Sequence, residues 1–385
     1  MRAQKVIAGI DLDKERPQFC YYDKGSQDTQ TAPLTAETEE TSFRDILKEL
    51  ELRAEKETLT AEVMSRLQKR STELFRRGFA SLGITDPEEQ LEGLMITAEQ
   101  LTRPLVTLLR ETCTRLGLGR GRSFLQDYRE SFFFHTLYQK PELWHRNVGF
   151  FRFDGRKVTF YSMAMDNMAR PIAVKIEEGI TVRLSEDRRR WDEQFYNMAN
   201  ASLRQNMYTS IFIMGELFDK SWAGRSISLL CKGGRKAFVV DNLFARGACY
   251  GAREKVDKRR LGDYLYLGDG LIRSNIGMEM MVQGKETYYP LISAGINWYE
   301  TEKVCECILT DKPELIFTIQ KEGEENVHHS LMPLPGMPKR PPKTTRIRLH
   351  LFFSEPRKCI IEAEDLGFGE LYPASGKIWR DSWEG

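Results

Sequence analysis

The sequence predicts an α/β domain over residues 1–257 and an all-β domain over residues 258–385. The first part mixes β-hairpins with strand–helix units, which favours a layered α/β architecture. Beyond the charged stretch that ends at Arg260, short strand-like runs alternate with Gly, Pro or charged turns, a pattern typical of a β-sandwich. A chain of 385 residues is also long enough for two domains.

Two predicted hairpins carry Asp and Gly in their bends. Residues 6–12 predict a buried strand and residues 17–22 its return strand, while a second hairpin is predicted over residues 148–163. Turn chemistry alone explains an Asp in a bend, and it is the preferred interpretation for any single residue. Tight turns also bring backbone N–H groups to phosphate oxygens, and a carboxylate can hold Mg²⁺ through water. A phosphate cleft is therefore the second interpretation.

Apolar residues at helical spacing predict most of the remaining first domain. Residues 23–41, rich in Thr, Gln and Glu, predict a loop. Ala245, Ala248, Cys249 and Ala252 share one face of the last helix, and this stripe predicts close approach to a neighbouring element. The further helices are expected as two segments within 42–83 and over 102–116, 124–138, 191–206 and 223–231, with strands at 94–97, 210–214 and 236–240.

The second domain is predicted from strand-like runs. His328 and His329 fall in a stretch that predicts an exposed turn. Residues 332–342 contain five prolines and predict an extended loop, which either shields a strand edge or serves as a polyproline ligand. The expected strands are residues 264–267, 278–282, 286–291, 304–308, 315–320, 347–353 and 359–363.

The composition disfavours several classes of function. Lys and Arg total 57 against 56 Asp and Glu, so no broad field attracts nucleic acid or anionic lipid. No apolar run approaches the roughly 18 residues of a spanning helix. We therefore expect a soluble, cytoplasmic protein that binds neither nucleic acid nor membrane. The seven cysteines include no CxxC pair, which favours reduced core thiols over a zinc site.

Taken in order, several segments resemble those of the superfamily of actin, sugar kinases and DnaK-type chaperones. Residues 9–13 (Gly-Ile-Asp-Leu-Asp) look like the first phosphate segment of the chaperones, and residues 211–215 (Ile-Phe-Ile-Met-Gly) look like their adenosine segment. Residues 215–222 carry the pattern Gly-Glu-x-Phe-Asp-x-x-Trp of DnaK-like bacterial proteins of unassigned function. The other similar segments are residues 94–97, 130–138, 241–252 and 360–366.

The resemblance implies a reduced actin-like ATPase fold, followed by a β-sandwich similar to the chaperone peptide-binding domain. It also implies a cleft for ATP or ADP with Mg²⁺. If the chain is an ATPase, the resemblance gives catalytic roles to Asp11, Glu130 and Asp154, with Asp11 and Asp154 as Mg²⁺ ligands. The residues expected to line the cleft are Gly9, Asp11, Asp13, Gly155, Gly215 and Glu216.

The chain departs from the chaperone pattern at each phosphate segment. Residues 13–16 (Asp-Lys-Glu-Arg) replace small residues and hydroxyls with bulk and charge. The second segment aligns with residues 152–157, which gives Arg152 the position of a metal-associated Asp, although a shift of two residues restores Asp154. Glu216 replaces the second glycine of the adenosine segment. The first domain is also shorter than a chaperone ATPase domain, which implies that a nucleotide-clamping subdomain is missing.

These departures favour a non-catalytic function. We expect a degenerate DnaK-like chaperone or scaffold module that binds a protein or an extended peptide segment, with weak or no ATP hydrolysis. Two alternatives stay open, namely an active Mg-ATP-dependent DnaK-like ATPase and an actin-like assembly protein. ATP turnover would identify the first alternative, and concentration-dependent sedimentation would identify the second.

Overall fold

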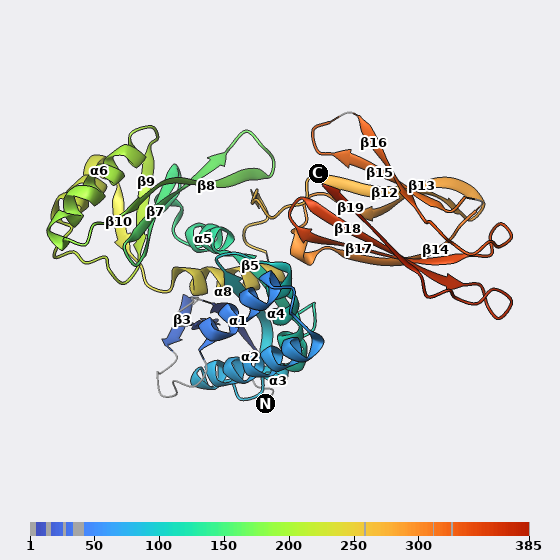
Figure 1. The fold of residues 1–385 in the computed structure, drawn as a ribbon. Helices are drawn as coiled ribbons and strands as arrows, with labels where there is room; N and C mark the ends of the chain where they lie inside the picture. The colour runs from blue at the N-terminus through green and yellow to red at the C-terminus, as the bar shows by residue number, and fades with distance from the viewer. Residues whose placement is uncertain are drawn as a thin grey trace. The chain divides into compact units, whose positions relative to one another are not determined.

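The computed structural model describes residues 5–12, 17–25, 28–33, 42–257, 259–310, 312–324 and 326–384. The chain divides into two units, residues 1–268 and residues 269–385. Figure 1 shows the mixed α/β content of the first unit and the all-β content of the second. Each unit is described by itself below.

The first unit contains two lobes with the same strand order. Lobe one has the order β3-β2-β1-β4-β5, and lobe two has the order β8-β7-β6-β9-β10, with β11 beside β8. In each lobe the first three strands are antiparallel neighbours, and the last two run parallel to the first strand. This duplication confirms the predicted actin-like fold of the first unit.

The strands of lobe one are β1 (Val6–Asp11), β2 (Gln18–Asp23), β3 (Asp28–Pro33), β4 (Leu91–Ala98) and β5 (Ser123–Asp127). Those of lobe two are β6 (Asn147–Asp154), β7 (Lys157–Asp166), β8 (Ile172–Arg183), β9 (Tyr208–Met214), β10 (Lys236–Val239) and β11 (Tyr264–Tyr266). Apart from the last helix of each lobe, which is described next, the α-helices of the first unit are α1 (Phe43–Glu55), α2 (Ala61–Ser81), α3 (Pro87–Gln90), α4 (Arg103–Arg115), α6 (Trp191–Leu203) and α7 (Gly224–Leu230). No helix in the described part of the chain has the length and apolar character needed to cross a membrane.

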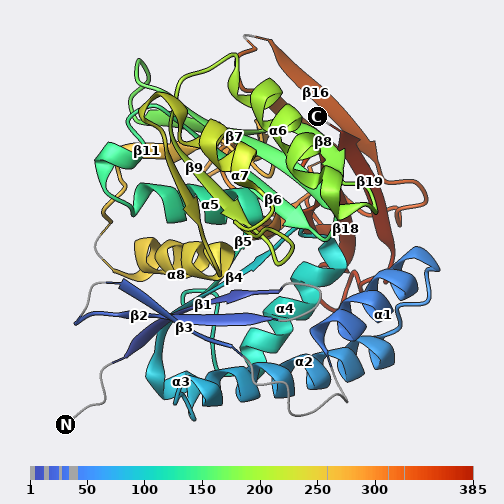
Figure 2. The ribbon, with the colours of Figure 1, turned by 90° about the vertical axis from the view of Figure 1, so that its left-hand side faces the viewer.

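The helix that ends each lobe packs on the other lobe. Helix α5 (Tyr128–Leu137) follows β5 of lobe one, yet its Phe132 ring lies 5.0 Å from that of Phe150 on β6. Helix α8 (Leu243–Val256) follows β10 of lobe two, yet Cys249 Sγ donates to the Ile7 carbonyl of β1 at 3.5 Å. Figure 2 shows α8 between the β1–β3 sheet and α5. Each lobe is therefore completed by a helix that the other supplies.

The crossing of α5 and α8 depends on small residues. A Cβ at Gly247 would lie closer than 3.0 Å to backbone atoms of Ser131 on α5. Ala245, Ala248 and Ala252 are fully buried. Gly247 therefore lets the two helix backbones approach each other closely. The predicted stripe on the neighbouring face of α8 is confirmed as a close approach to β1, since a Cβ at Gly9 would meet the backbone of Ala245 and Cys249.

Four strands of the first unit differ from the predictions. Residues 28–33, predicted as loop, pair with β2 as strand β3, and residues 123–127, predicted as the start of a helix, form β5 beside β4. Strand β8 was not predicted. Strand β11, predicted within the second domain, runs parallel to β8. Because that pairing ties β11 to lobe two, the first unit extends to residue 268, beyond the predicted boundary at residue 257.

The second unit is a β-sandwich of two four-stranded antiparallel sheets, in the orders β13-β12-β15-β16 and β14-β17-β18-β19. Alternate residues are buried, as on β17, where Ile347, Leu349 and Leu351 have no exposed surface. The strands are β12 (Ser274–Val282), β13 (Lys285–Ile292), β14 (Glu302–Ile308), β15 (Glu314–Lys321), β16 (Val327–Pro333), β17 (Arg346–Glu355), β18 (Lys358–Gly367) and β19 (Ile378–Glu384). Strands β16 and β19 were not predicted. The predicted turn at His328 and His329 is wrong, because both lie within β16.

The Pro-rich loop between β16 and β17 is fastened to its own domain. The Arg340 guanidinium donates to both carboxylate oxygens of Asp365 on β18, at 2.7 and 2.8 Å. These side chains are 5% and 0% exposed, so the ion pair is buried. Trp379 of β19 also donates from Nε1 to the Pro335 carbonyl at 3.0 Å. The contacts favour a structural role for the loop over that of a polyproline ligand.

Candidate functional site

The predicted cleft residues lie mainly at the carboxyl ends of strands. Asp11 ends β1, Asp154 ends β6, and Gly215 follows β9 directly. Ligands of α/β sheets bind beyond this edge. An ion pair between Arg152 of β6 and Glu99, which follows β4, shows that these edges of the two lobes face each other.

The predicted acidic residues differ in their surroundings. Asp11 is 2% exposed, whereas Asp154 is exposed beside Gly155, whose φ of 53° serves the hairpin turn. Glu130 lies half-buried in the first turn of α5. Asp13 lies outside the described residues. Within the described ranges, no group of three or more His, Cys, Asp or Glu side chains is arranged to hold a metal ion.

Gly9 and Gly215 are the two predicted cleft glycines outside the hairpin turn. At each of them the missing side chain makes room for another part of the chain. A Cβ at Gly9 would lie closer than 3.0 Å to the backbone of Cys249 on α8. Gly215 has a φ of 132°, and a Cβ there would meet the Phe153 carbonyl of β6. Glu216 is exposed. The space at Gly9 is thus used by α8, and the space at Gly215 by β6.

Arg152 contacts residues of both lobes at the facing edges. Its Nη1 donates to Glu99 Oε1 at 2.7 Å and its Nη2 to Glu99 Oε2 at 3.2 Å. The guanidinium carbon lies 5.0 Å from the ring centroid of Tyr128 and 5.7 Å from that of Phe244. The two rings stack at 3.8 Å with 8° between their planes. We call Glu99, Tyr128, Arg152 and Phe244 the inter-lobe cluster.

The inter-lobe cluster keeps the Arg152 guanidinium in its charged form. Burial lowers the pKa of Arg152, but the hydrogen bonds and the charge of Glu99 outweigh burial and raise this pKa above its ordinary value. Arg152 therefore stays ionised. In one register of the resemblance this position belongs to a metal-associated Asp, and a shift of two residues gives that position to Asp154 instead.

Sequence reasoning found one member of the inter-lobe cluster and missed the other three. The alignment of the second phosphate segment singles out Arg152. Glu99 lies two residues beyond the predicted strand at residues 94–97, which was the available signal, but it is 53 residues from Arg152 in sequence. Tyr128 and Phe244 read as ordinary helix residues.

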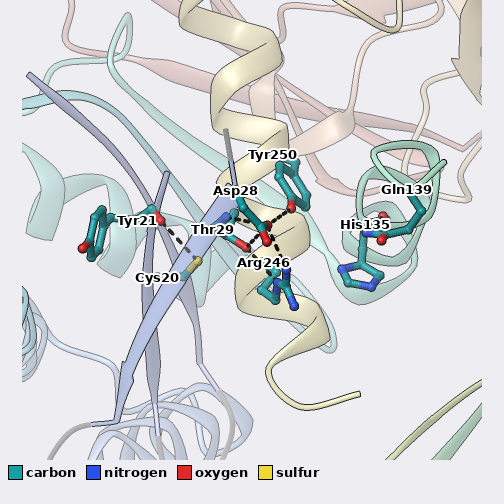
Figure 3. Close-up of polar contacts among 8 residues, drawn as sticks. All are labelled: Cys20, Tyr21, Asp28, Thr29, His135, Gln139, Arg246 and Tyr250. Carbon is teal, nitrogen blue, oxygen red and sulfur yellow. Dashed lines mark hydrogen bonds and ion pairs between the residues drawn. The ribbon is translucent and has the colours of Figure 1, made fainter. Parts of the chain in front are cut away.

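A second polar cluster joins β3 to α8 (Figure 3). Arg246 donates to Asp28 Oδ1 at 2.9 Å and to Thr29 Oγ1 at 2.7 Å, and the Tyr250 hydroxyl donates to Asp28 Oδ1 at 2.8 Å. His135 of α5 points toward this group, and burial, assisted by the Arg246 charge, lowers its pKa to about 3. Its ring is therefore neutral at neutral pH. None of the predicted site residues belongs to this cluster, which ties an edge strand to α8.

The comparisons with known families place both units. Residues 30–269 match the C-terminal part of a family of unknown function, DUF5716, over more than half of the chain. The chain belongs to this family. Residues 271–384 match a domain of unknown function, DUF8552. The border between the two matches coincides with the end of the first unit at residue 268. No curated protein matches the chain.

Solved structures with low similarity include three that span about two thirds of the chain. A Bacteroides thetaiotaomicron protein with an actin-like ATPase fold and unknown function is 10% identical, with a TM-score of 0.34, covering 64% of this chain and 96% of its own. The protein EutJ from Carboxydothermus hydrogenoformans is 9% identical, with a TM-score of 0.33 and coverages of 64% and 89%. The activator of 2-hydroxyisocaproyl-CoA dehydratase from Clostridium difficile, with bound ADPNP, is 11% identical, with a TM-score of 0.34 and coverages of 65% and 95%. Similarity at these TM-scores says nothing about the chemistry of this chain.

Proposed function

We propose that the chain is a degenerate DnaK-like chaperone or scaffold module, which binds a protein or extended peptide segment and hydrolyses ATP weakly or not at all. The observation that supports this proposal is the Arg152–Glu99 pair between the facing lobe edges. The first unit then serves as a scaffold, and the second unit contacts the bound segment.

The Arg152–Glu99 pair makes the cleft a poor site for phosphoryl transfer. Such chemistry depends on a positioned Mg²⁺ and on donors around the γ-phosphate. A guanidinium has no acceptor atom and cannot coordinate a cation, so Arg152 offers no ligand to Mg²⁺. Glu99 already satisfies the guanidinium, so a phosphate group must first displace a bidentate carboxylate. Both effects weaken the binding of Mg-ATP.

We expect titration of the full chain with Mg-ATP to show no saturation up to about 1 mM. ATP hydrolysis by the chain should equal that of the Asp11→Ala variant, because a degenerate cleft gains nothing from that carboxylate. Asp381→Ala, in the second unit, is the matched control. Steady turnover that is abolished by Asp11→Ala and kept by Asp381→Ala would refute the proposal and identify a working ATPase.

The edge of strand β16 is the proposed contact for the bound segment. β16 ends its sheet, and an edge strand presents unpaired N–H and C=O groups to which an extended peptide can add as a further strand. Leu331 on β16 is 53% exposed and pairs in register with Ile316, which is 47% exposed. Val327, on the same strand, is 43% exposed. These side chains favour a peptide with apolar residues at alternate positions.

We expect the full chain to bind such peptides from a library and Leu331→Glu to weaken this binding at least about tenfold, because a charge is then desolvated at the contact. Val304→Glu is the matched control, since Val304 is 56% exposed on β14, an edge strand of the other sheet. Equal losses in both variants would contradict the assignment to β16. Binding no better than that of an unrelated β-sandwich would dispose of the peptide-binding proposal.

A further inference from the structure

The ion pair between Arg152 and Glu99 spans the cleft between the lobes. Arg152 belongs to β6 of lobe two, and Glu99 follows β4 of lobe one. The bidentate geometry, at 2.7 and 3.2 Å, fixes the orientation of the two groups as well as their separation. The Arg152 side chain is 12% exposed and that of Glu99 is 40% exposed. The guanidinium is thus the inner partner and the carboxylate the outer one.

The aromatic part of the inter-lobe cluster holds the guanidinium on its inner side. Tyr128 is the first residue of α5 and Phe244 the second residue of α8. The guanidinium therefore lies over the first turn of both helices that pack on the opposite lobe. Cations over aromatic faces are attracted, more strongly where water is excluded. Separation of the two edges must therefore either break the bidentate pair or pull Arg152 off the stacked rings.

We infer that the Arg152–Glu99 pair is an internal lock that holds the two lobes of the first unit closed without a ligand. In hinged proteins a ligand bound between two bodies supplies the contacts that favour closure. Here the carboxylate of Glu99 supplies them from within the chain. The inference concerns the same cleft as the proposed function, but it requires neither nucleotide nor peptide.

The test is a distance measurement between the lobes by pulsed electron paramagnetic resonance on the full chain, without nucleotide. Spin labels are attached at Ser81→Cys on α2 and Ser228→Cys on α7, both exposed positions. The labelled chain should give one narrow distance distribution. Glu99→Gln should shift it to longer distances and broaden it, because the amide keeps the shape and loses the charge. The native cysteines replaced by serine beforehand are Cys231, Cys305 and Cys307.

A second variant and a control make the result decisive. Arg152→Lys should also lengthen the distances, since lysine keeps the charge and loses the planar fork. If Glu99→Gln does not fold, the distances in Arg152→Lys test the lock. Arg156→Gln is the control, because Arg156 pairs with Glu186 within lobe two, at 3.3 Å, and that glutamate is 91% exposed. Unchanged distances in both lock variants, or equal shifts in the control, would overturn the inference. Saturable ATP binding would contradict the proposed function, whereas the inference of a lock is tested by the inter-lobe distances alone.

Discussion

Replacing Gly247 with valine is expected to lower the free energy of unfolding of the first unit by about 3 kcal/mol, at the upper end of the usual cost of overpacking. The first added carbon already lies closer than 3.0 Å to backbone atoms of Ser131, which have no rotamer to change. Helices α5 and α8 must therefore move apart. Thermal unfolding followed by the helical circular dichroism signal should show a midpoint lower by about 6–12 °C.

Gly224→Val provides the control for this substitution. Gly224 begins α7, and nothing lies within 4 Å of a Cβ built there. The same change of residue type should shift the midpoint little, because only local backbone preference is altered. Similar shifts at the two positions would show that the close helix crossing does not limit stability.

Replacing Asp365 with asparagine is expected to destabilise the second unit by about 3–5 kcal/mol, the usual cost of leaving one member of a buried ion pair without its partner. The Arg340 side chain is 5% exposed, so its charge stays buried after the carboxylate is lost. Asp365 also accepts hydrogen bonds from the backbone N–H groups of Gly367 and Ser375, both at 2.9 Å. Urea unfolding followed by the β-sheet signal measures the change.

The same ion pair predicts sensitivity to acid. The hydrogen bonds of Arg340, opposed by burial and assisted by those of Ser375 and Gly367, hold the pKa of Asp365 well below its ordinary value. A carboxyl group with a depressed folded pKa contributes stability above its unfolded value of about 3.9 and loses that contribution as the pH falls toward the folded value. The stability of the second unit should therefore fall below about pH 4. Asp365→Asn, which cannot titrate, should show a flatter dependence there.

Arg380→Ala controls for the loss of an ion pair as such. Arg380 pairs with Glu362 at 2.8 Å on the same sheet, but its side chain is 73% exposed. Exposed pairs contribute about 0–1 kcal/mol, so this variant should unfold almost as the parent chain does. If Asp365→Asn is as mild as Arg380→Ala, the buried charge of Arg340 is not what stabilises the Pro-rich loop.

Much of the fold could be predicted from apolar patterning, and the misses share a physical cause. The buried strands β1, β6 and β9 and the stripe on α8 follow from residues that are apolar at regular spacing. Strand β3 (Asp-Thr-Gln-Thr-Ala-Pro) is polar, and most of β8 is exposed. Both lie near sheet edges, so their pairing with β2 and β7 determines them rather than an apolar pattern. Strand β16, which begins with Val-His-His, is likewise an edge strand whose residues are mostly exposed, so its apolar pattern is weak.

The candidate site was predictable on one side only. Strand ends and hairpin bends can be read locally, so Asp11, Asp154 and Gly215 were placed at the correct edges of their strands. The partner of Arg152 could not be found, because nothing in the local pattern around Glu99 specifies which distant strand its carboxylate faces. A local pattern can also have a second cause. Gly9 lies in a phosphate-like segment, but the structure uses this glycine for the packing of α8 on β1.

The exchange of α5 and α8 delays the folding of lobe one during synthesis. Ile7 of β1 and its contact Cys249 are 242 residues apart in the chain. At about 5–20 residues per second on the ribosome, the first sheet waits roughly 10–50 s for the helix that covers it. During that time the apolar side chains of Ile7 and Met95, buried beneath α8 in the finished protein, have no native cover. The nascent chain of the first unit is thus open to aggregation until residue 256 has emerged, and lobe one, although made first, cannot be the first part to complete its core.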